Sequence, residues 1–257
     1  MKNTQNNELA VCGLAAVKKL EKIHPECIKR LYFTEAVAPL FGGLCKKLAR
    51  NRRIYNAVAA ADLEKLCGTV HHQGVVAMRS LPEIVPLDSD IVAGWVMAHE
   101  HVLVLDRIGN ANNFGAIIRS AAFFGMKHIV IPNDAAQSSI TTSTYRIAEG
   151  GMEMVTVYSV NSIPRLLDAA AGAFFRIGTD LKSRTPVAAV RHTAHGKPYL
   201  IILGNEERGI SDAIRRQCDA LVIIPFAGMQ ESRPAPTVDS LNVAQSASVV
   251  LYELLCR

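Results

Sequence analysis

The sequence predicts an α/β protein whose larger part contains a mostly parallel sheet with helices on both faces. Short apolar runs alternate with helical patterns through residues 99–257, and the run from Val102 to Leu105 is continuously apolar, as in a strand covered on both sides. Polar loops follow three of the expected strands, at 106–113, 204–210 and 226–239. Because ligands bind outside the carboxyl ends of parallel strands, these loops are the expected place for a site.

Length and composition exclude several classes of protein. The 257 residues, 49% of them hydrophobic, suffice for the core of one or two domains. No apolar run approaches the ~20 residues of a membrane span, and the polar start lacks a signal-peptide pattern, so a cytoplasmic protein is expected. The six cysteines are scattered without a CxxC pair, and His99-Glu-His101 has no further ligands nearby. We therefore expect no metal site.

The positive charge is concentrated in the first third of the chain. Residues 1–80 contain 13 Lys and Arg against 6 Asp and Glu, whereas the rest of the chain has 15 against 17. The basic residues cluster at Lys46, Lys47, Arg50, Arg52 and Arg53. Such an asymmetry indicates a polyanion-binding region, although a solvated helix face accounts for the charge equally well.

The first 80 residues predict a small α/β domain, because strand and helix patterns alternate twice within them. Helices are expected at 11–21, 39–49 and 60–66, and strands at 28–33, 54–58 and 74–78. Gly68 lies just past the last of these helices, as a C-terminal cap does. Residues 81–98 follow, with Pro82 and Pro86 near their start, and are expected to form a linker.

Residues 99–257 repeat the alternation on a larger scale and are expected to form the second domain. Strands are expected at 101–105, 128–132, 154–158, 173–178, 199–203 and 221–225. Helices are expected at 113–124, 143–148, 162–171, 211–216 and 240–255.

The loop after the 101–105 strand leads into an apolar helix that contains one cation. Asn112 or Asn113 can cap this helix. Arg119 lies in its middle and must either reach solvent or point into a site. From this stretch alone, a solvent-reaching Arg on a half-exposed helix is the favoured interpretation.

The other two loops also contain residues typical of a site. Gly204 permits a sharp turn and a close backbone approach, Ser211 can cap the next helix, and Glu206 can accept backbone hydrogen bonds or orient a substrate group. Asn242, at the start of the last helix, is equally ordinary as a cap or turn residue. Taken singly, each loop is explained by local structure.

Together the three loops resemble the motifs of the SpoU (TrmH) family of RNA ribose 2′-O-methyltransferases, within the SPOUT superfamily. The matching stretches are Asn113-Phe-Gly-Ala-Ile-Ile-Arg119-Ser-Ala, Leu203-Gly-Asn-Glu206-Glu-Arg-Gly-Ile-Ser and Ile224-Pro followed by Ser240-Leu-Asn242-Val. The first 80 residues also resemble the substrate-binding domain of many members, from Cys12-Gly-Leu to His72-Gln-Gly-Val-Val-Ala77. The resemblance thus covers almost the whole chain.

The resemblance implies a fold and a reaction that composition and spacing do not. It implies an L30e-like substrate-binding domain at 1–80 and a catalytic domain at 99–257 with a deep trefoil knot, which usually forms a homodimer. It implies methyl transfer from S-adenosylmethionine to a ribose 2′-hydroxyl of structured RNA. Ribosomal and transfer RNA are both candidate substrates, and the substrate-binding domain favours ribosomal RNA. The basic cluster of residues 46–53 would bind that RNA.

The resemblance also assigns roles to individual residues. Around the transferred methyl it places Arg119, Asn113, Glu206, Ser240 and Asn242, and in the cofactor site Leu203, Gly204, Gly209, Ile224 and Leu241. A guanidinium has a pKa above ~12 and accepts no hydrogen bond, so Arg119 is expected to hold a phosphate or the 2′-oxygen and to stabilise developing negative charge. Asn113 is expected to fix the Arg119 loop, and Glu206 to orient Arg119 or its own turn.

The chain departs from the family pattern in the third motif. Residues 229–239 separate Gly228 from Ser240, where the family has a compact loop, and Ala244-Gln245 follow Val243 in place of the usual residues. The departure is compatible with a lid or substrate contact. It is also compatible with a second hypothesis, a catalytically weak or inactive RNA-binding or ribosome-assembly protein on the same scaffold.

Overall fold

The structure is a computed structural model that describes residues 2–3, 7–226 and 240–256. The chain divides into two compact units, which are described separately below. Unit 1 comprises Met1–Glu83 and Ser139–Met154, and unit 2 comprises Ile84–Ser138 and Val155–Arg257. The polypeptide therefore passes between the units three times. None of the helices within the described ranges has the length and apolar content needed to cross a bilayer.

Unit 2 is built on a seven-stranded sheet in which every described pairing is parallel. The strand order is β12-β10-β11-β7-β8-β9-β6. The strands are β6 (Val85–Pro86), β7 (Val102–Asp106), β8 (His128–Pro132), β9 (Thr156–Val160), β10 (Phe175–Thr179), β11 (Tyr199–Gly204) and β12 (Ala220–Val222). The central strands β7 and β11 are buried along their whole length, as their apolar sequences predict.

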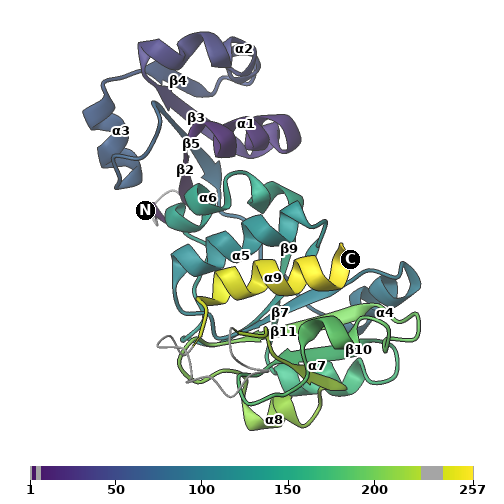
Figure 1. Cartoon of the computed structure of the whole chain (residues 1–257). Helices are drawn as coiled ribbons and strands as arrows, with labels where there is room; N and C mark the ends of the chain where they lie inside the picture. Colours follow the sequence, from purple (N-terminus) through teal and green to yellow (C-terminus); the bar gives the residue numbers. More distant parts are fainter. Residues whose placement is uncertain (1, 4–6, 227–239, 257) are drawn as a thin grey trace. The chain divides into compact units, whose positions relative to one another are not determined.

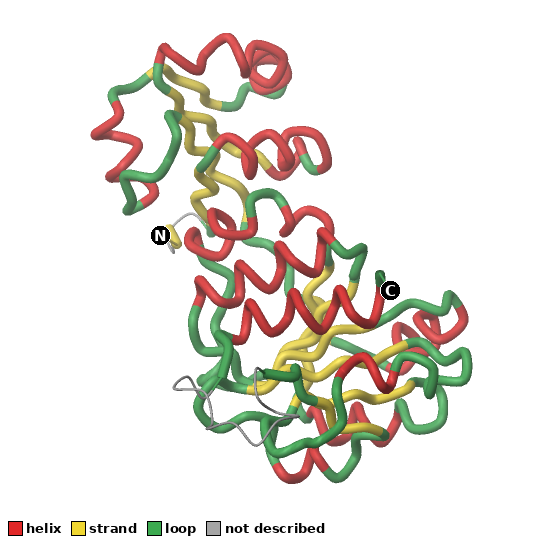
Figure 2. Tube along the Cα trace, viewed as in Figure 1, coloured by secondary structure: helices red, strands yellow, loops and turns green. Residues whose placement is uncertain are grey.

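Helices cover both faces of this sheet (Figure 1; Figure 2). On one face α5 (Ala111–Phe123) lies beside α9 (Val243–Leu255), where the hydroxyl oxygens of Ser120 and Ser248 are 2.7 Å apart. On the other face α4 (Ser89–Met97), α7 (Ile163–Ala169) and α8 (Asp212–Arg215) bury Trp95, Leu166 and Ile214 against Val104 and Ile202. The short helix η4 (Val187–Val190) precedes β11.

The segment expected to be a linker, 81–98, contains regular structure. Helix α4 begins after Asp88, whose side chain accepts a hydrogen bond from the backbone N–H of Ile91 at 2.9 Å. Trp95 is only 4% exposed and packs edge-on to Tyr158, with ring centroids 4.9 Å apart. Proline content alone suggested a loop, but an N-cap and a buried Trp make this segment part of the unit 2 core.

Unit 1 is a five-stranded mixed sheet with the order β1-β2-β5-β3-β4. Its strands are β1 (Lys2–Asn3), β2 (Glu8–Cys12), β3 (Ile28–Phe33), β4 (Ile54–Ala57) and β5 (Val75–Ser80). Its helices are α1 (Leu14–Ile23), η1 (Pro25–Cys27), η2 (Glu35–Phe41), α2 (Gly42–Arg50), α3 (Ala60–Cys67), α6 (Thr142–Ala148) and η3 (Gly151–Met154). Gly68 caps α3 in the left-handed conformation, as expected.

Strand β2 and the unit 1 helices α6 and η3 differ from the sequence-based expectation. Val11 was expected to start a helix, but it lies in the fully buried strand β2, and the helix begins at Leu14. A short continuous apolar run fits a buried strand and a buried helix segment equally, so periodicity does not separate the two. Helix α6 was predicted at its position, 143–148, but it belongs to unit 1.

A buried polar network attaches α6 and η3 within unit 1. The Arg79 guanidinium donates to Glu153 Oε1 at 2.9 Å and to the Tyr145 hydroxyl, and all three residues are less than 10% exposed. Burial raises the pKa of the Glu153 carboxyl, while the positive charge of Arg79 opposes that rise. Removing one partner would leave an unpaired buried group, so the network fixes the mid-chain segment in unit 1.

Candidate active site

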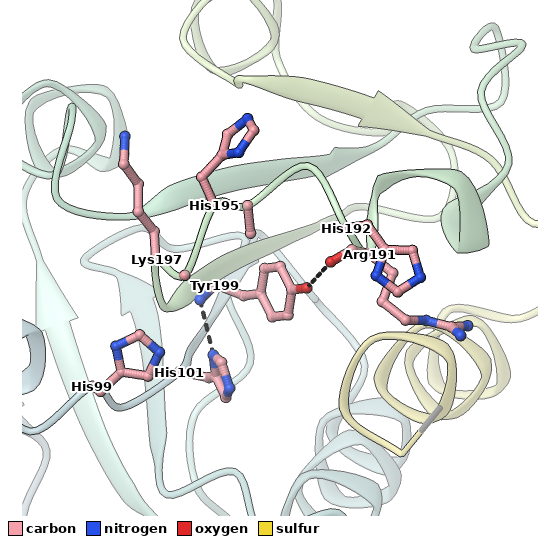
Figure 3. Close-up of a pocket in the computed structure, with 9 residues that line it drawn as sticks. His99, His101, Arg191, His192, His195, Lys197 and Tyr199 are labelled. Atoms are coloured by element: carbon pink, nitrogen blue, oxygen red, sulfur yellow. Dashed lines mark hydrogen bonds between the residues drawn. The ribbon is translucent and has the colours of Figure 1, made fainter.

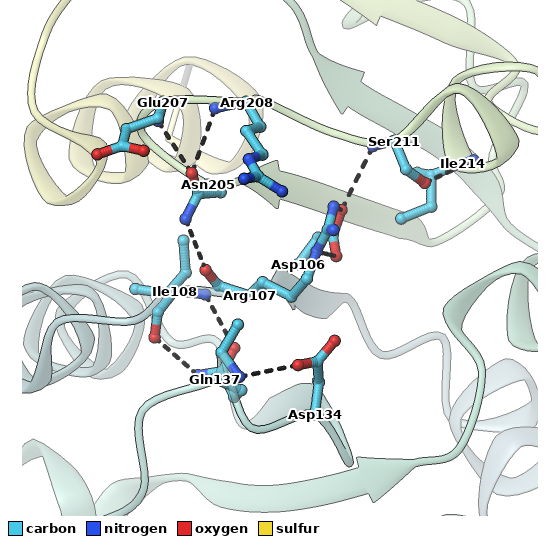
Figure 4. Close-up of polar contacts among 11 residues, drawn as sticks. Asp106, Arg107, Ile108, Asp134, Gln137, Asn205, Glu207, Arg208, Ser211 and Ile214 are labelled. Carbon is cyan, nitrogen blue, oxygen red and sulfur yellow. Dashed lines mark hydrogen bonds and ion pairs between the residues drawn. The ribbon is translucent and has the colours of Figure 1, made fainter.

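The loop after β7 is held by a buried carboxylate. Asp106 is 4% exposed and accepts from its neighbour Arg107, with Nε to Oδ1 at 2.8 Å and Nη2 to Oδ2 at 3.0 Å. Its Oδ2 also accepts from the backbone N–H of Ser211 at 3.4 Å (Figure 4). The hydrogen bonds with Asp106 raise the pKa of the Arg107 guanidinium. The bond from Ser211 joins the end of β7 to the segment after β11, because Ser211 is the N-cap of α8, the next helix along the chain.

Asn205 organises the loop after β11. Its side-chain amide donates to the Arg107 carbonyl at 3.0 Å, and its Oδ1 accepts from the backbone N–H groups of Glu207 and Arg208 at 3.0 and 3.2 Å (Figure 4). Its own carbonyl accepts from the N–H of Gly209 at 2.8 Å. One side chain thus closes the turn and joins it to the neighbouring loop.

Gly204 permits this turn because there is no room for a side chain. A Cβ at Gly204 would lie 2.3 Å from the carbonyl carbon of Gly209 and 2.3 Å from the nitrogen of Ile210. The sequence predicted a close backbone approach here, and the neighbour is the loop's own backbone. Gly209 itself has φ +64°, a conformation that favours glycine.

The N-cap of helix α5 lies two residues before the first of the expected caps. Asn110 is the N-cap, and its Oδ1 accepts from the N–H of Asn112 at 2.8 Å and of Asn113 at 3.4 Å. The prediction that Asn112 or Asn113 caps the helix was therefore wrong. Because Asn110 makes these bonds, the amide of Asn113 is available for other partners.

Asn113 joins the three motif loops. Its Nδ2 donates to Glu206 Oε1 in the loop after β11, and its Oδ1 accepts from Asn242 Nδ2 at 3.1 Å. Asn242 in turn caps α9 by accepting from the N–H of Ala244 at 2.9 Å. Asn113 thus meets, where the strands end, two residues that lie 93 and 129 positions further along the chain.

Arg119 and Ser240 lie near this triad but extend from it. Arg119 is exposed on α5, six residues after Asn113, which is about 9 Å along the helix axis at 1.5 Å per residue. Ser240 is exposed just before Asn242. Both residues therefore present their side chains toward solvent, as groups that meet a large substrate must.

The residues predicted for the cofactor all lie at the carboxyl ends of β11 and β12 or before α9. Leu203 and Gly204 are buried, Gly209 and Ile224 are half-buried, and Leu241 is 48% exposed. Phe226, which the sequence did not single out, is 46% exposed at the same edge. Open apolar side chains beside strand-end backbone groups suit a ligand that combines an apolar ring face with polar groups. The expected insertion at 229–239 lies outside the described residues.

The predicted RNA-binding residues lie in unit 1, on α2 and the turn after it. Lys46, Lys47, Arg50 and Arg52 are exposed. Arg53 is half-buried, and its Nη1 donates to the carbonyls of residues 26 and 28 at 2.7 and 2.5 Å. Four of the five cations are thus exposed to solvent, and the fifth holds the local backbone together.

Asp106, Asn110 and Asn205 are residues that the sequence did not single out. Each binds backbone groups, and Asp and Asn immediately after an apolar run are the signal that could have indicated them. A metal centre finds no support in the described part of the chain, where no three His, Cys, Asp or Glu residues are placed to hold an ion.

Two family models match the chain. Residues 100–252 match the SpoU rRNA Methylase family, and residues 10–84 match the family described as RNA 2′-O ribose methyltransferase substrate binding. The chain is 30% identical to an uncharacterized tRNA/rRNA methyltransferase, YfiF, of Escherichia coli O157:H7, over 98% of this chain and 69% of that one. It is 29% identical to the 23S rRNA (guanosine-2′-O-)-methyltransferase RlmB of Acinetobacter baylyi, over 95% of each.

Solved structures share the fold. The SpoU methyltransferase AviRb of Streptomyces viridochromogenes superposes with a TM-score of 0.73 at 24% identity, covering 98% of this chain and 90% of that one. An AdoMet-bound rRNA methyltransferase of Sinorhizobium meliloti gives 0.72 at 20% identity, covering 97% and 87%. At such identities the likeness establishes the architecture, a mostly parallel α/β sheet.

Proposed function

The chain belongs to the SpoU rRNA methylase family, and from that membership we propose that it transfers a methyl group from S-adenosylmethionine to a ribose 2′-hydroxyl of structured RNA. The observation that carries the proposal is the triad of Asn113, Glu206 and Asn242, one residue from each of three loops at a single sheet edge. Local structure explains each loop singly. It does not explain why their side chains bond to one another.

The triad holds the three loops of the site in position relative to one another. Asn113 uses its amide N–H on Glu206 and its amide oxygen on Asn242, so the starts of α5 and α9 are fixed to the loop after β11. Methyl transfer is an in-line displacement, in which correct alignment alone contributes up to ~7–11 kcal/mol. Bound S-adenosylmethionine supplies an electrophilic methyl group. We place its apolar parts near Ile224 and Leu241, which are partly exposed at this edge.

Arg119 acts on the RNA. Its permanently charged guanidinium cannot accept the hydroxyl proton. It holds a phosphate or the 2′-oxygen of the target nucleotide and stabilises the negative charge that develops there. The exposed position of Arg119 supports this role, because an RNA ribose reaches the site from solvent.

The RNA partner is ribosomal RNA. Relatives of similar length are named 23S rRNA methyltransferases. The exposed cations of α2, within the segment that matches the substrate-binding model, supply phosphate contacts in unit 1. Affinity for RNA should therefore fall steeply with salt concentration.

The assembly proposed for the protein is a cytoplasmic homodimer, with an L30e-like unit 1 and a trefoil knot in unit 2. Exposed aromatic side chains on the paired helices α5 and α9 support self-association. Phe123 is 82% exposed and Tyr252 is 40% exposed, and both flank Phe124. Single exposed apolar residues are common, but adjacent aromatic residues on two helices indicate an interface.

Calorimetry and methyl mapping test the proposal together. Titration with S-adenosylmethionine should show binding, and 2′-O-methyl mapping of ribosomal RNA from cells with and without the protein should show one missing modification. Binding of RNA without any binding of the cofactor at millimolar concentration would instead support the non-catalytic alternative, which the altered third motif favours. A missing methyl group in transfer RNA would correct the substrate class and leave the reaction unchanged.

A further inference from the structure

A second polar region lies at the other ends of the same strands. His99 and His101, just before β7, and seven residues between 191 and 199, leading into β11, line an open pocket of about 380 Å³ (Figure 3). The pocket is at the amino edge of the sheet, whereas the triad is at the carboxyl edge. Tyr199 begins β11 and Gly204 ends it, so roughly 17 Å of strand separates the two regions at ~3.3 Å per residue.

The pocket is lined by nitrogen-bearing side chains. These are His99, His101, Arg191, His192, His195 and Lys197, and none of the other described lining residues is acidic. Figure 3 shows the rings of His99 and His101 together on one side and His192 with Arg191 on another. No described group of three such side chains is placed to hold a metal ion, so the cluster suits an anion.

Two of these side chains are fixed by the protein. Arg191 donates from Nη2 to Glu253 Oε2 at 2.7 Å, so its charge is partly compensated. His101 Nδ1 accepts from the backbone N–H of Tyr199 at 2.8 Å, and its ring stacks on Tyr199 with centroids 5.1 Å apart. With Nδ1 accepting, the proton of the neutral ring is on Nε2, which leaves a positioned donor. Burial and the neighbouring His99 lower the pKa of His101.

The remaining nitrogen-bearing side chains are open to solvent. His99, His192, His195 and Lys197 are all exposed. Small anions are held in enclosed sites by buried donors, because water competes for exposed ones. Exposed imidazole rings and the Lys197 ammonium, spread over two segments, instead suit a polyanion, whose phosphates can be contacted at several points.

We propose that this pocket, at the amino ends of β7 and β11, is a docking site for the phosphate backbone of the substrate RNA. The proposal rests on the proposed function, because it takes the polyanion to be the RNA that is methylated. Phosphate contacts carry no sequence information, but they fix register and orientation. The pocket thus holds RNA that flanks the target nucleotide, and its lining side chains act on binding without touching the reacting atoms.

The test compares two double variants of the full chain. In the first, His195→Ala and Lys197→Ala remove two exposed pocket groups. In the second, Arg165→Ala and Arg216→Ala remove two exposed cations of unit 2 outside the pocket. Fluorescence anisotropy with a labelled RNA stem–loop from ribosomal RNA is measured without cofactor over a range of salt concentrations. Calorimetry with S-adenosylmethionine shows in each case that the carboxyl edge is intact.

The pocket variant should bind the stem–loop roughly five- to tenfold more weakly, and the slope of log affinity against log salt should fall by about 1. Cofactor affinity should be unchanged. An unchanged RNA affinity and slope would overturn the proposal, as would an equal loss in the control variant. So would saturable binding of inorganic phosphate in the pocket that displaces no RNA. Because RNA binding is measured without methyl transfer, failure of the proposed reaction would be seen separately.

Discussion

The two edges of the unit 2 sheet use polar side chains in opposite ways. At the carboxyl edge Asp106, Asn205 and Asn113 bind the backbone and side chains of neighbouring loops. At the amino edge four exposed cationic or imidazole side chains face solvent around a pocket. The loops at the carboxyl edge are thus held by hydrogen bonds to one another, whereas the polar side chains at the amino edge are open to solvent. Chemistry needs the first arrangement, whereas binding a charged polymer needs only the second.

The largest effect is expected when Arg119 is replaced at the carboxyl edge, where methyl transfer is proposed to take place. Arg119→Ala should lower methyl transfer by at least ~100-fold, the cost of losing one donor to a developing oxyanion, and should leave cofactor binding intact. Arg119→Lys should also fail if two parallel hydrogen bonds are needed. The measurement is single-turnover transfer of labelled methyl to RNA, with calorimetry on the cofactor. Equal loss of both activities with an unfolded protein would indicate a structural role.

The second test separates the triad from simple packing. Asn113→Ala should reduce methyl transfer roughly 10- to 100-fold, because Glu206 and Asn242 lose their common partner and the loops lose alignment. Asn112→Ala is the matched control, since Asn112 is exposed and only its backbone N–H is bonded to the cap. Equal activity of the two variants would show that the triad does not position the site.

A third test addresses the turn after β11. Gly204→Ala should lower the free energy of unfolding by about 1–3 kcal/mol, because the added methyl would overlap the backbone of Gly209 and Ile210. Urea denaturation measures this loss, and calorimetry should show weaker cofactor binding because the turn must open. Gly125→Ala is strained by its φ of +78° but meets no atom within 4 Å, so it separates conformational strain from overlap. A Gly204→Ala protein as stable as wild type would contradict the close approach.

The smallest effect is expected at the amino edge, where Asp219 accepts two hydrogen bonds from the Arg176 guanidinium at 2.7 and 2.9 Å. These bonds lower the pKa of Asp219 below its usual 3.8. The unfolded chain therefore binds this proton more readily, so the stabilisation is present at neutral pH and is lost as pH falls below 3.8.

Asp219→Asn should therefore cost about 1 kcal/mol of unfolding free energy at neutral pH, since solvent screens the partly exposed pair. The difference from wild type should shrink in denaturation curves measured at successively lower pH. Methyl transfer should stay at the wild-type rate. A loss of catalysis in this variant would break the separation between the two edges.

Much of unit 2 could be predicted because its signals are local. Strand β8 has the predicted bounds, 128–132, since an apolar run of this length is typical of a strand and too short for a helix. Asn242 was considered as a cap and is one. The meeting of Asn113, Glu206 and Asn242 was expected from the motif resemblance, which supplied what no single loop could.

Other features depend on contacts that are distant in sequence. The membership of α6 in unit 1 depends on Arg79 reaching Tyr145, 66 positions away. Asn205 was not predicted because its partners are backbone atoms, which any sequence has. The side chains that line the amino-edge pocket come from two segments about 90 residues apart, and single His and Lys residues have no pattern that indicates a common site.

The mid-chain segment 139–154 has a consequence for how such proteins can be rearranged in evolution. Because the chain passes between the units three times, a gene fusion that joins a substrate-binding unit at one point near residue 84 leaves α6 and η3 behind. The transplanted unit would keep Arg79 without Glu153, an uncompensated buried charge of the kind that costs about 3–5 kcal/mol. In this chain, replacing residues 1–83 without residues 139–154 should therefore destabilise unit 1.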